Sequence, residues 1–145
     1  MIDIPEIARI RRLAYDYELR GSNKLLKYSD EELQHIYNGV GPDRWPDNVR
    51  KLLTGLAALF EPAVMIHDTE FKESDGTVSS FLDTVDHFKA NVKLILKAEY
   101  PLWTWNMLKT SYRVRRAAAA ALGAALVVAI SSDTALEIFK AEASK

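Results

Sequence analysis

The sequence predicts an all-α protein with one domain, and two observations carry this prediction. Apolar residues recur at intervals of three and four, the period of an α-helix, and no stretch alternates apolar and polar residues as a strand would. Short clusters of glycine, proline, aspartate and asparagine separate the helical stretches. A chain of 145 residues is long enough to bury one core without disulfides.

The first two helices have clear boundaries in the sequence. Apolar residues at helical spacing predict a helix over residues 4–20, and Gly21 ends it. The next helix is predicted over residues 30–37. Ser29 caps it and Glu32 follows three residues later, which together form a capping box.

An irregular loop separates these helices from the rest of the chain. Residues 38–48 read NGVGPDRWPDN and contain two glycines and two prolines, a composition that excludes regular structure. A helix is predicted from near Pro46 to about Leu59. Pro62 suits the first turn of the following helix, and SDGT at residues 74–77 predicts a turn after it.

The second half of the chain predicts three more helices. They cover residues 78–98, then 102–131 after the break at Pro101, and finally 133–142. The helix over residues 78–98 carries a core-facing stripe with spacings of four and three. The residues of this stripe are Phe81, Val85, Phe88, Val92 and Ile95.

Composition and charge exclude several classes of function. The net charge is −1, from 19 basic and 20 acidic residues, which argues against nucleic-acid binding driven by overall charge. The chain has no cysteine, and this excludes disulfides and thiol catalysis. The first 20 residues lack the pattern of a signal peptide, so we expect a protein that is cytoplasmic as synthesised.

The longest apolar run is AAAAALGAALVVAI, at residues 117–130. It is shorter than the roughly 20 residues that a transmembrane helix needs. We therefore expect a buried or interface helix here, and its alanine-rich face is a candidate contact for a homo-oligomer.

A histidine and an aspartate stand side by side in the apolar sequence FEPAVMIHDTEF, residues 60–71. A histidine can act as a general base when one ring nitrogen is held and the other is free. The helices flanking the turn at residues 74–77 should form an antiparallel hairpin, so a carboxylate on the second helix could hold His67. Asp86 and Asp83 are the candidates, and at about 100° per residue Asp86 lies nearer to the interface.

Asp68 points about 100° away from His67 on the same helix, and it could bind a hard cation instead. Ca²⁺ takes six to eight oxygen ligands, usually including backbone carbonyls. The irregular sequence NGVGPD, residues 38–43, has such carbonyls and the freedom of two glycines. A base, an orienting acid, a metal-binding carboxylate and a carbonyl loop could therefore converge.

The order and spacing of these pieces resemble the phospholipase A2 superfamily, especially its small bacterial and phage-type members. Those proteins carry a Gly-Cys-Gly-Pro loop followed by Trp, then Ala-Cys-x-x-His-Asp-x-x-Tyr, then a helix with Asp and Phe. The corresponding stretches here read NGVGPDRW, PAVMIHDTEF and DHFKAN, at residues 38–45, 62–71 and 86–91. The sequence YRVRRAAAAALGAALVV, residues 112–128, resembles the helix that follows in the phage-type proteins.

The resemblance covers residues 36–128 and implies a phospholipase A2-like core there, built on an antiparallel helix pair without disulfides. Residues 1–35 would then form an N-terminal helical extension, and residues 129–145 a C-terminal helix.

The activity that the resemblance implies is that of a calcium-dependent lipid esterase. His67 would deprotonate a water molecule, and Asp86 would orient the imidazole and stabilise its charged form. Asp68 would bind Ca²⁺ together with carbonyls around Gly39 and Gly41, and the ion would stabilise the oxyanion. The partner would be a phospholipid or another lipid, with a membrane surface as a further candidate. The residues expected to contact the substrate are Leu33, Ile36, Tyr37 and Phe71.

Several positions depart from the pattern of the family. Val40 and Val64 replace cysteines, and Phe71 replaces a tyrosine whose lost hydrogen bond would cost about 1 kcal/mol. Asp43 and Arg44 stand where the calcium loop is often rich in glycine. These departures favour an alternative, a catalytically inactive phospholipase A2-like binding or structural module.

The remaining histidines and tryptophans predict less specific roles. His35 and His87 are expected at solvated helix positions. Trp103 and Trp105 are expected to pack together at the start of a helix, with a bilayer interface as the alternative. The basic run at residues 113–116 is expected to be a solvated face, with phospholipid headgroups as the alternative partner.

Overall fold

The computed structural model describes residues 2–37 and 57–144, and every regular element in these ranges is a helix, as predicted. The α-helices are α1 (Ile4–Asp16), α2 (Asp30–Ile36), α4 (Glu61–Glu73), α5 (Val78–Glu99), α6 (Thr110–Ile130) and α7 (Asp133–Ala143). Short 3₁₀ helices are η1 (Ser22–Lys27), η2 (Ala58–Phe60) and η3 (Trp105–Leu108).

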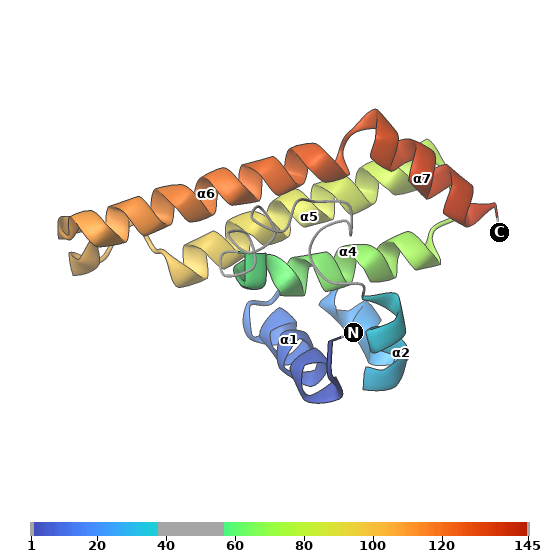
Figure 1. The fold of residues 1–145 in the computed structure, drawn as a ribbon, viewed down its shortest axis with the longest axis horizontal. Coiled ribbons are helices and arrows are strands. Elements are labelled where there is room, and N and C mark those ends of the chain that lie inside the picture. The colour runs from blue at the N-terminus through green and yellow to red at the C-terminus, as the bar shows by residue number, and fades with distance from the viewer. Residues whose placement is uncertain (1, 38–56, 145) are drawn as a thin grey trace.

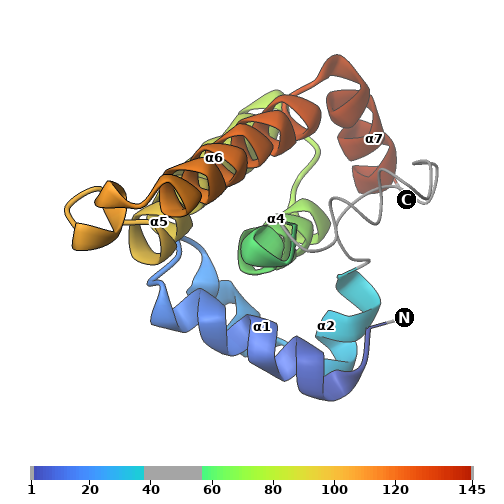
Figure 2. The ribbon, with the colours of Figure 1, turned by 60° about the vertical axis from the view of Figure 1, so that its left-hand side comes forward.

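Helix α4 lies at the centre of the described part of the molecule (Figure 1). It contacts α1, α2 and η1 on one side and α5 on the other, while α6 packs along α5. Figure 2 shows the N-terminal helices and the α5–α6 pair on opposite sides of α4. Helix α7 contacts both α4 and α5, near the turn that joins these two helices.

The core runs continuously through these layers. One cluster of buried side chains joins α1, η1 and α2 to α4, α5 and α6. Its largest fully buried members are Phe60, Phe88, Ile7, Ile10, Leu25, Leu33, Met65, Ile66 and Ile95. A smaller cluster of Phe81, Val85 and Phe139 fixes α7 on the hairpin.

The stripe predicted for α5 is confirmed, because all five of its residues are buried. The capping box of α2 is confirmed too, since Ser29 and Glu32 each bond the other's backbone N–H. The turn before α5 is also present, with Gly76 at a φ of +75° and the Thr77 side chain capping the helix.

Two predicted boundaries differ from the structure. Helix α1 ends at Asp16 rather than at residue 20, and the chain then turns, with Glu18 at a φ of +51°. The 3₁₀ helix η1 follows Gly21 before α2 begins. Helix α6 begins at Thr110 rather than at residue 102, because the chain first forms η3 after Pro101.

Helix α6 has one buried and one exposed side. Gly123 lets it approach α5 closely, because a Cβ there would lie 2.7 Å from the Val92 side chain. Exposed alanines on the other side are Ala117, Ala118, Ala121, Ala124, Ala125 and Ala129. The expectation of a buried or interface helix is met on one side, and oligomerisation through the other side stays a prediction.

Some expectations cannot be compared with the structure. The loop at residues 38–48 with Gly39 and Gly41 lies outside the described residues, as does most of the helix predicted from Pro46 to Leu59.

Among the described helices, none is by itself long and apolar enough to cross a membrane. One pair of consecutive helices reaches that length and composition when taken together, and the two are bent by 53° to each other. These are the segments Thr110–Ile130 and Asp133–Ala141.

Candidate functional sites

His67 lies in an apolar environment on α4. Its ring packs against Phe71 and Phe88, with ring centroids 5.5 Å and 5.7 Å away. The side chain is 12% exposed, and its Nδ1 lies 3.4 Å from Oδ1 of the adjacent Asp68. Nε2 is buried and has no hydrogen-bond partner among the residues that the structure describes. A buried ring nitrogen without a partner is costly and requires an explanation.

Asp86 does not hold His67 as predicted. Its side chain is 73% exposed, and its carboxylate pairs with Lys89 one turn further along α5, at 3.6 Å. Asp83 is also exposed. The reason is the width of the α5 interface, where Val85 and Phe88 fill the surface that faces α4. An aspartate about 120° from the centre of such a stripe reaches solvent.

The described residues do not form the predicted calcium site by themselves. Asp68 is one carboxylate, whereas Ca²⁺ requires six to eight oxygens. Within residues 2–37 and 57–144 there is no group of three or more acidic or histidine side chains that could hold a metal ion. The carbonyls expected from Gly39 and Gly41 lie outside these ranges.

The residues expected to contact substrate occupy packing positions. Leu33 and Tyr37 are buried in the main core, and Ile36 packs against it. Phe71 packs on Phe139 of α7, with ring centroids 4.6 Å apart. The hydroxyl of Tyr37 is buried with no hydrogen-bond partner in the described part of the chain. Burial raises the pKa of Tyr37 far above its usual value, and the carboxylates of Glu61 and Asp68 raise it further.

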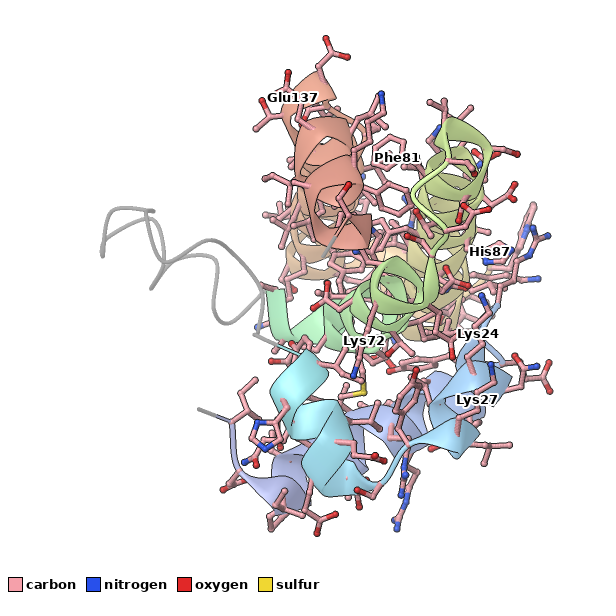
Figure 3. The ribbon with its side chains drawn as sticks, turned by 90° about the vertical axis from the view of Figure 1, so that its right-hand side faces the viewer. Lys24, Lys27, Lys72, Phe81, His87 and Glu137 are labelled. Atoms are coloured by element: carbon pink, nitrogen blue, oxygen red, sulfur yellow. The ribbon has the colours of Figure 1, made fainter. Side chains whose placement is uncertain are left out.

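A different group of ionisable side chains meets between η1, α4 and α5. Glu70 is 2% exposed, and its Oε1 accepts hydrogen bonds from Lys24 Nζ at 2.9 Å and from His87 Nδ1 at 2.7 Å. Figure 3 shows Lys24 and His87 reaching the same side of the molecule from η1 and α5. The His87 side chain is 37% exposed, so the expected solvated position is met in part, but a buried carboxylate also holds one of its nitrogens.

The chain folds so that the backbone after α1 comes close to Glu70. Gly21 has a φ of +84°, and a Cβ there would lie 2.8 Å from Glu70 Oε1 and 2.9 Å from Ile66 Cγ2. Glycine therefore permits both the turn and the approach. Next to it, the buried Asn91 side chain accepts from the Arg20 N–H at 2.7 Å and donates to the Arg20 carbonyl at 2.9 Å.

This group lines an open pocket of about 430 Å³, which we call the Glu70 pocket. Its lining residues are Lys24, Glu70, Glu73, Ser74, Ser80, Asp83, Thr84 and His87. Glu73 is paired with Lys27 at 3.0 Å and also accepts from the Tyr28 hydroxyl at 3.1 Å. Glu70 and Lys24 were not predicted as site residues, because they are 46 residues apart in the sequence and meet only where η1 packs on α4.

A second feature lies at the far end of the α5–α6 pair (Figure 1). The chain between these helices exposes four large apolar side chains, Leu102, Trp103, Trp105 and Leu108, which we call the tryptophan tip. Trp103 is 98% exposed and Trp105 is 87% exposed. The expectation that the two tryptophans pack at the start of a helix is therefore wrong.

The tryptophan tip is held in place by polar contacts to α6 rather than by its own apolar side chains. The Tyr112 hydroxyl donates to the Pro101 carbonyl at 3.0 Å, and Arg116 Nε donates to the Tyr100 carbonyl at 3.2 Å. The rings of Tyr100 and Tyr112 also pack together, 5.6 Å apart. The turn is thereby fixed while its indoles remain in solvent.

The stretch of sequence that contains the tryptophan tip and α6 has only positive charges. No aspartate or glutamate occurs between Glu99 and Asp133, although the whole chain has 20 acidic residues. The same stretch contains Lys109, Arg113, Arg115 and Arg116, and the first three are exposed. A basic and apolar end is thus attached to a chain whose net charge is −1.

Comparison of this chain with protein-family models, with curated proteins and with solved structures finds no match.

Proposed function

We propose that this chain binds the surface of anionic phospholipid membranes through the tryptophan tip. The observation that carries the proposal is the exposure of Trp103 and Trp105 on a fixed turn inside a stretch with four basic residues and no acidic one. Large exposed apolar groups on a folded protein mark interaction surfaces. Tryptophan in particular favours the membrane–water interface, where its ring is half apolar and half polar.

The energies available at the tryptophan tip suffice for reversible binding. Immersing about 100 Å² of one indole contributes about 2.5 kcal/mol at ~25 cal/mol per Å². Each lysine or arginine near an anionic surface adds about 1 kcal/mol. Two indoles and the exposed Lys109, Arg113 and Arg115 therefore provide several kcal/mol, part of which offsets the cost of association.

An anionic bilayer fits this surface better than a protein groove does. The cations follow the apolar side chains in the sequence, and a bilayer presents both anionic headgroups and acyl chains. The tryptophan tip also lies at the end of a long helix pair (Figure 1), and both of its indoles are exposed to solvent.

Co-sedimentation with vesicles tests the proposal. We expect binding to vesicles that contain phosphatidylglycerol, weaker binding to pure phosphatidylcholine, and weakening by added salt because the charge term is screened. Trp103→Ala with Trp105→Ala should lower the partition coefficient by at least about 30-fold. Arg113→Gln with Arg115→Gln should lower the preference for the anionic lipid by about 30-fold, at ~1 kcal/mol for each charge.

Matched controls separate the tryptophan tip from general stickiness and charge. Leu26→Ala removes another exposed apolar side chain, on η1, and Lys93→Gln with Lys140→Gln removes two exposed charges elsewhere. Both control proteins should bind like the wild type. Binding that survives loss of both tip tryptophans, or that falls equally in the controls, contradicts the proposal.

A second candidate is the calcium-dependent lipid esterase that the resemblance implies, with a phospholipase A2-like core. The antiparallel α4–α5 pair and the buried Nε2 of His67 without a partner support it, since a catalytic base keeps one nitrogen for a substrate or a water. The position of Asp86 favours the inactive module instead, because no described carboxylate from α5 holds the imidazole.

Fatty-acid release from the same vesicles distinguishes an active esterase from the catalytically inactive module. An esterase releases fatty acid with calcium but not with chelator, and both His67→Ala and Asp68→Ala lose the release. Asp86→Asn should retain it, since Asp86 is exposed and paired with Lys89. Vesicle binding without any release identifies a binding module and leaves the tryptophan tip proposal intact.

A further inference from the structure

The Glu70 pocket contains acceptor atoms that the described protein groups do not satisfy. Oε1 of Glu70 receives two donors, while its Oε2 is buried and has none among the described residues. Oγ of Ser74 is likewise buried without a partner. Both residues line the pocket. Burying a carboxylate oxygen without a hydrogen-bond donor costs free energy, so a ligand that donates a hydrogen bond to Glu70 Oε2 would be stabilised in the pocket.

The pocket also carries an excess of negative charge. Three carboxylates line it, and because Lys24 pairs with Glu70 and Lys27 with Glu73, the carboxylate of Asp83 is left in excess. Asp83 has no ion pair within the described part of the chain, whereas Asp86, one turn further along α5, is paired with Lys89. A concave site lined by one sign of charge concentrates ligands of the opposite sign.

The chemistry of these acceptors favours an organic cation. The described residues do not form a group that could hold a metal ion, whereas a protonated amine brings N–H donors for single oxygens. Lys24 and His87 fix Glu70 through Oε1, so Oε2 keeps its lone pairs for a donor that enters the pocket. The hydroxyl hydrogen of Ser74 can rotate so that an oxygen lone pair faces the same donor.

We propose that the Glu70 pocket binds a small organic cation with N–H donors, of the alkylammonium class. One ammonium group of the ligand donates to Glu70 Oε2 and Ser74 Oγ, and its charge is balanced by Asp83 at the rim. Lys24 and His87 stay on Oε1, so the ligand completes the coordination of the carboxylate instead of displacing either residue. This site lies on α4, α5 and η1, away from the tryptophan tip, and is independent of membrane binding.

The test is a titration of the full chain with putrescine, followed by NMR through the ring signals of His87. We expect a saturable shift, because the ligand joins the carboxylate that already holds the imidazole. Tetramethylammonium carries a positive charge but no N–H donor, and it should bind at least about tenfold more weakly. Equal binding of the two cations would overturn the proposal, as would the absence of saturable binding of putrescine.

Two variants and a control locate the site. Asp83→Asn should weaken putrescine binding about tenfold, the usual effect of losing one charge-assisted hydrogen bond. Ser74→Ala should weaken it too, without changing the charge. Asp86→Asn makes the same change one turn away on α5, outside the pocket, and should leave binding unaltered. If Asp86→Asn weakens binding as much as Asp83→Asn does, the cation binds the general surface charge and the proposal is wrong.

Discussion

Asn91 joins α5 to the chain that follows α1, and we predict that replacing it destabilises the whole fold. Its side chain is fully buried and makes two hydrogen bonds with the backbone of Arg20, which lies 71 positions earlier in the sequence. These bonds fix the turn that brings Gly21 over Glu70. Asn91→Ala removes both bonds and leaves the N–H and carbonyl groups of Arg20 without their partners.

The cost follows from the two bonds and the burial. Each intramolecular hydrogen bond contributes about 1 kcal/mol net, and a buried group left without a partner costs about 1–3 kcal/mol. Because the Arg20 groups are part-buried, water can satisfy them in part. We therefore expect Asn91→Ala to lower the free energy of unfolding by about 2–4 kcal/mol, a large fraction of the ~5–15 kcal/mol typical of a domain. The melting temperature should fall by about 5–15 °C.

Urea denaturation followed by circular dichroism measures this change. Asn91→Asp separates hydrogen bonding from volume, because it keeps the acceptor for the Arg20 N–H and sets an oxygen against the Arg20 carbonyl. It should therefore cost nearly as much as Asn91→Ala, and the Arg20 amide should exchange faster in both variants. Lys93→Ala, at an exposed position on the same helix, is the control. A loss below about 1 kcal/mol in Asn91→Ala would refute the reasoning.

Two further predictions concern single atoms. Gly21→Ala should lower the free energy of unfolding by at least about 2 kcal/mol, because an alanine is strained at a φ of +84° and its Cβ would lie 2.8 Å from Glu70 Oε1. The substitution should also shift the NMR signals of the His87 ring. An unchanged melting temperature would contradict this prediction. Tyr37→Phe removes a buried hydroxyl without a described partner, so it should leave stability unchanged or raise it by about 1 kcal/mol at neutral pH. Burial raises the pKa of Tyr37 in the folded state above its value in the unfolded chain. The wild type therefore keeps its full free energy of unfolding below pH ~10 and loses part of it as the pH rises further. Denaturation at several alkaline pH values should therefore show a shallower decline for Tyr37→Phe, and a steeper one would be inconsistent.

The fold could be predicted where its signals are local. The stripe on α5 depends on a period within one helix, and the capping box of α2 on two residues three apart. Both are present because side chains at these spacings meet whatever the rest of the chain does. The start of α6 was predicted too early because proline was treated as a break between helices, whereas the chain after Pro101 first forms η3.

The candidate sites depend on contacts across the chain, and for this reason the sequence predicted them poorly. The direction of Asp86 was derived for a hairpin seen alone, in which an aspartate 120° from the stripe could still reach α4. In the structure that surface is already filled by Phe88 and Val85, and the aspartate is in solvent. Glu70 reads as a polar position on the edge of α4 until η1 covers it and supplies Lys24.

The tryptophan tip is a different case, because each of its sequence features, taken alone, is typical of a more common structure. A cluster of aromatic residues is usually packed, and a basic run before a helix is usually a solvated face. A packed cluster needs an element to pack against, and a connection of about ten residues between two long helices provides none of its own. In the described structure the α5–α6 pair extends past α4 and the N-terminal helices (Figure 1), and both Trp103 and Trp105 are exposed. The lack of any acidic residue between Glu99 and Asp133 is the reason for proposing an anionic surface as their partner, since such a surface gains from the four cations in the same stretch of sequence.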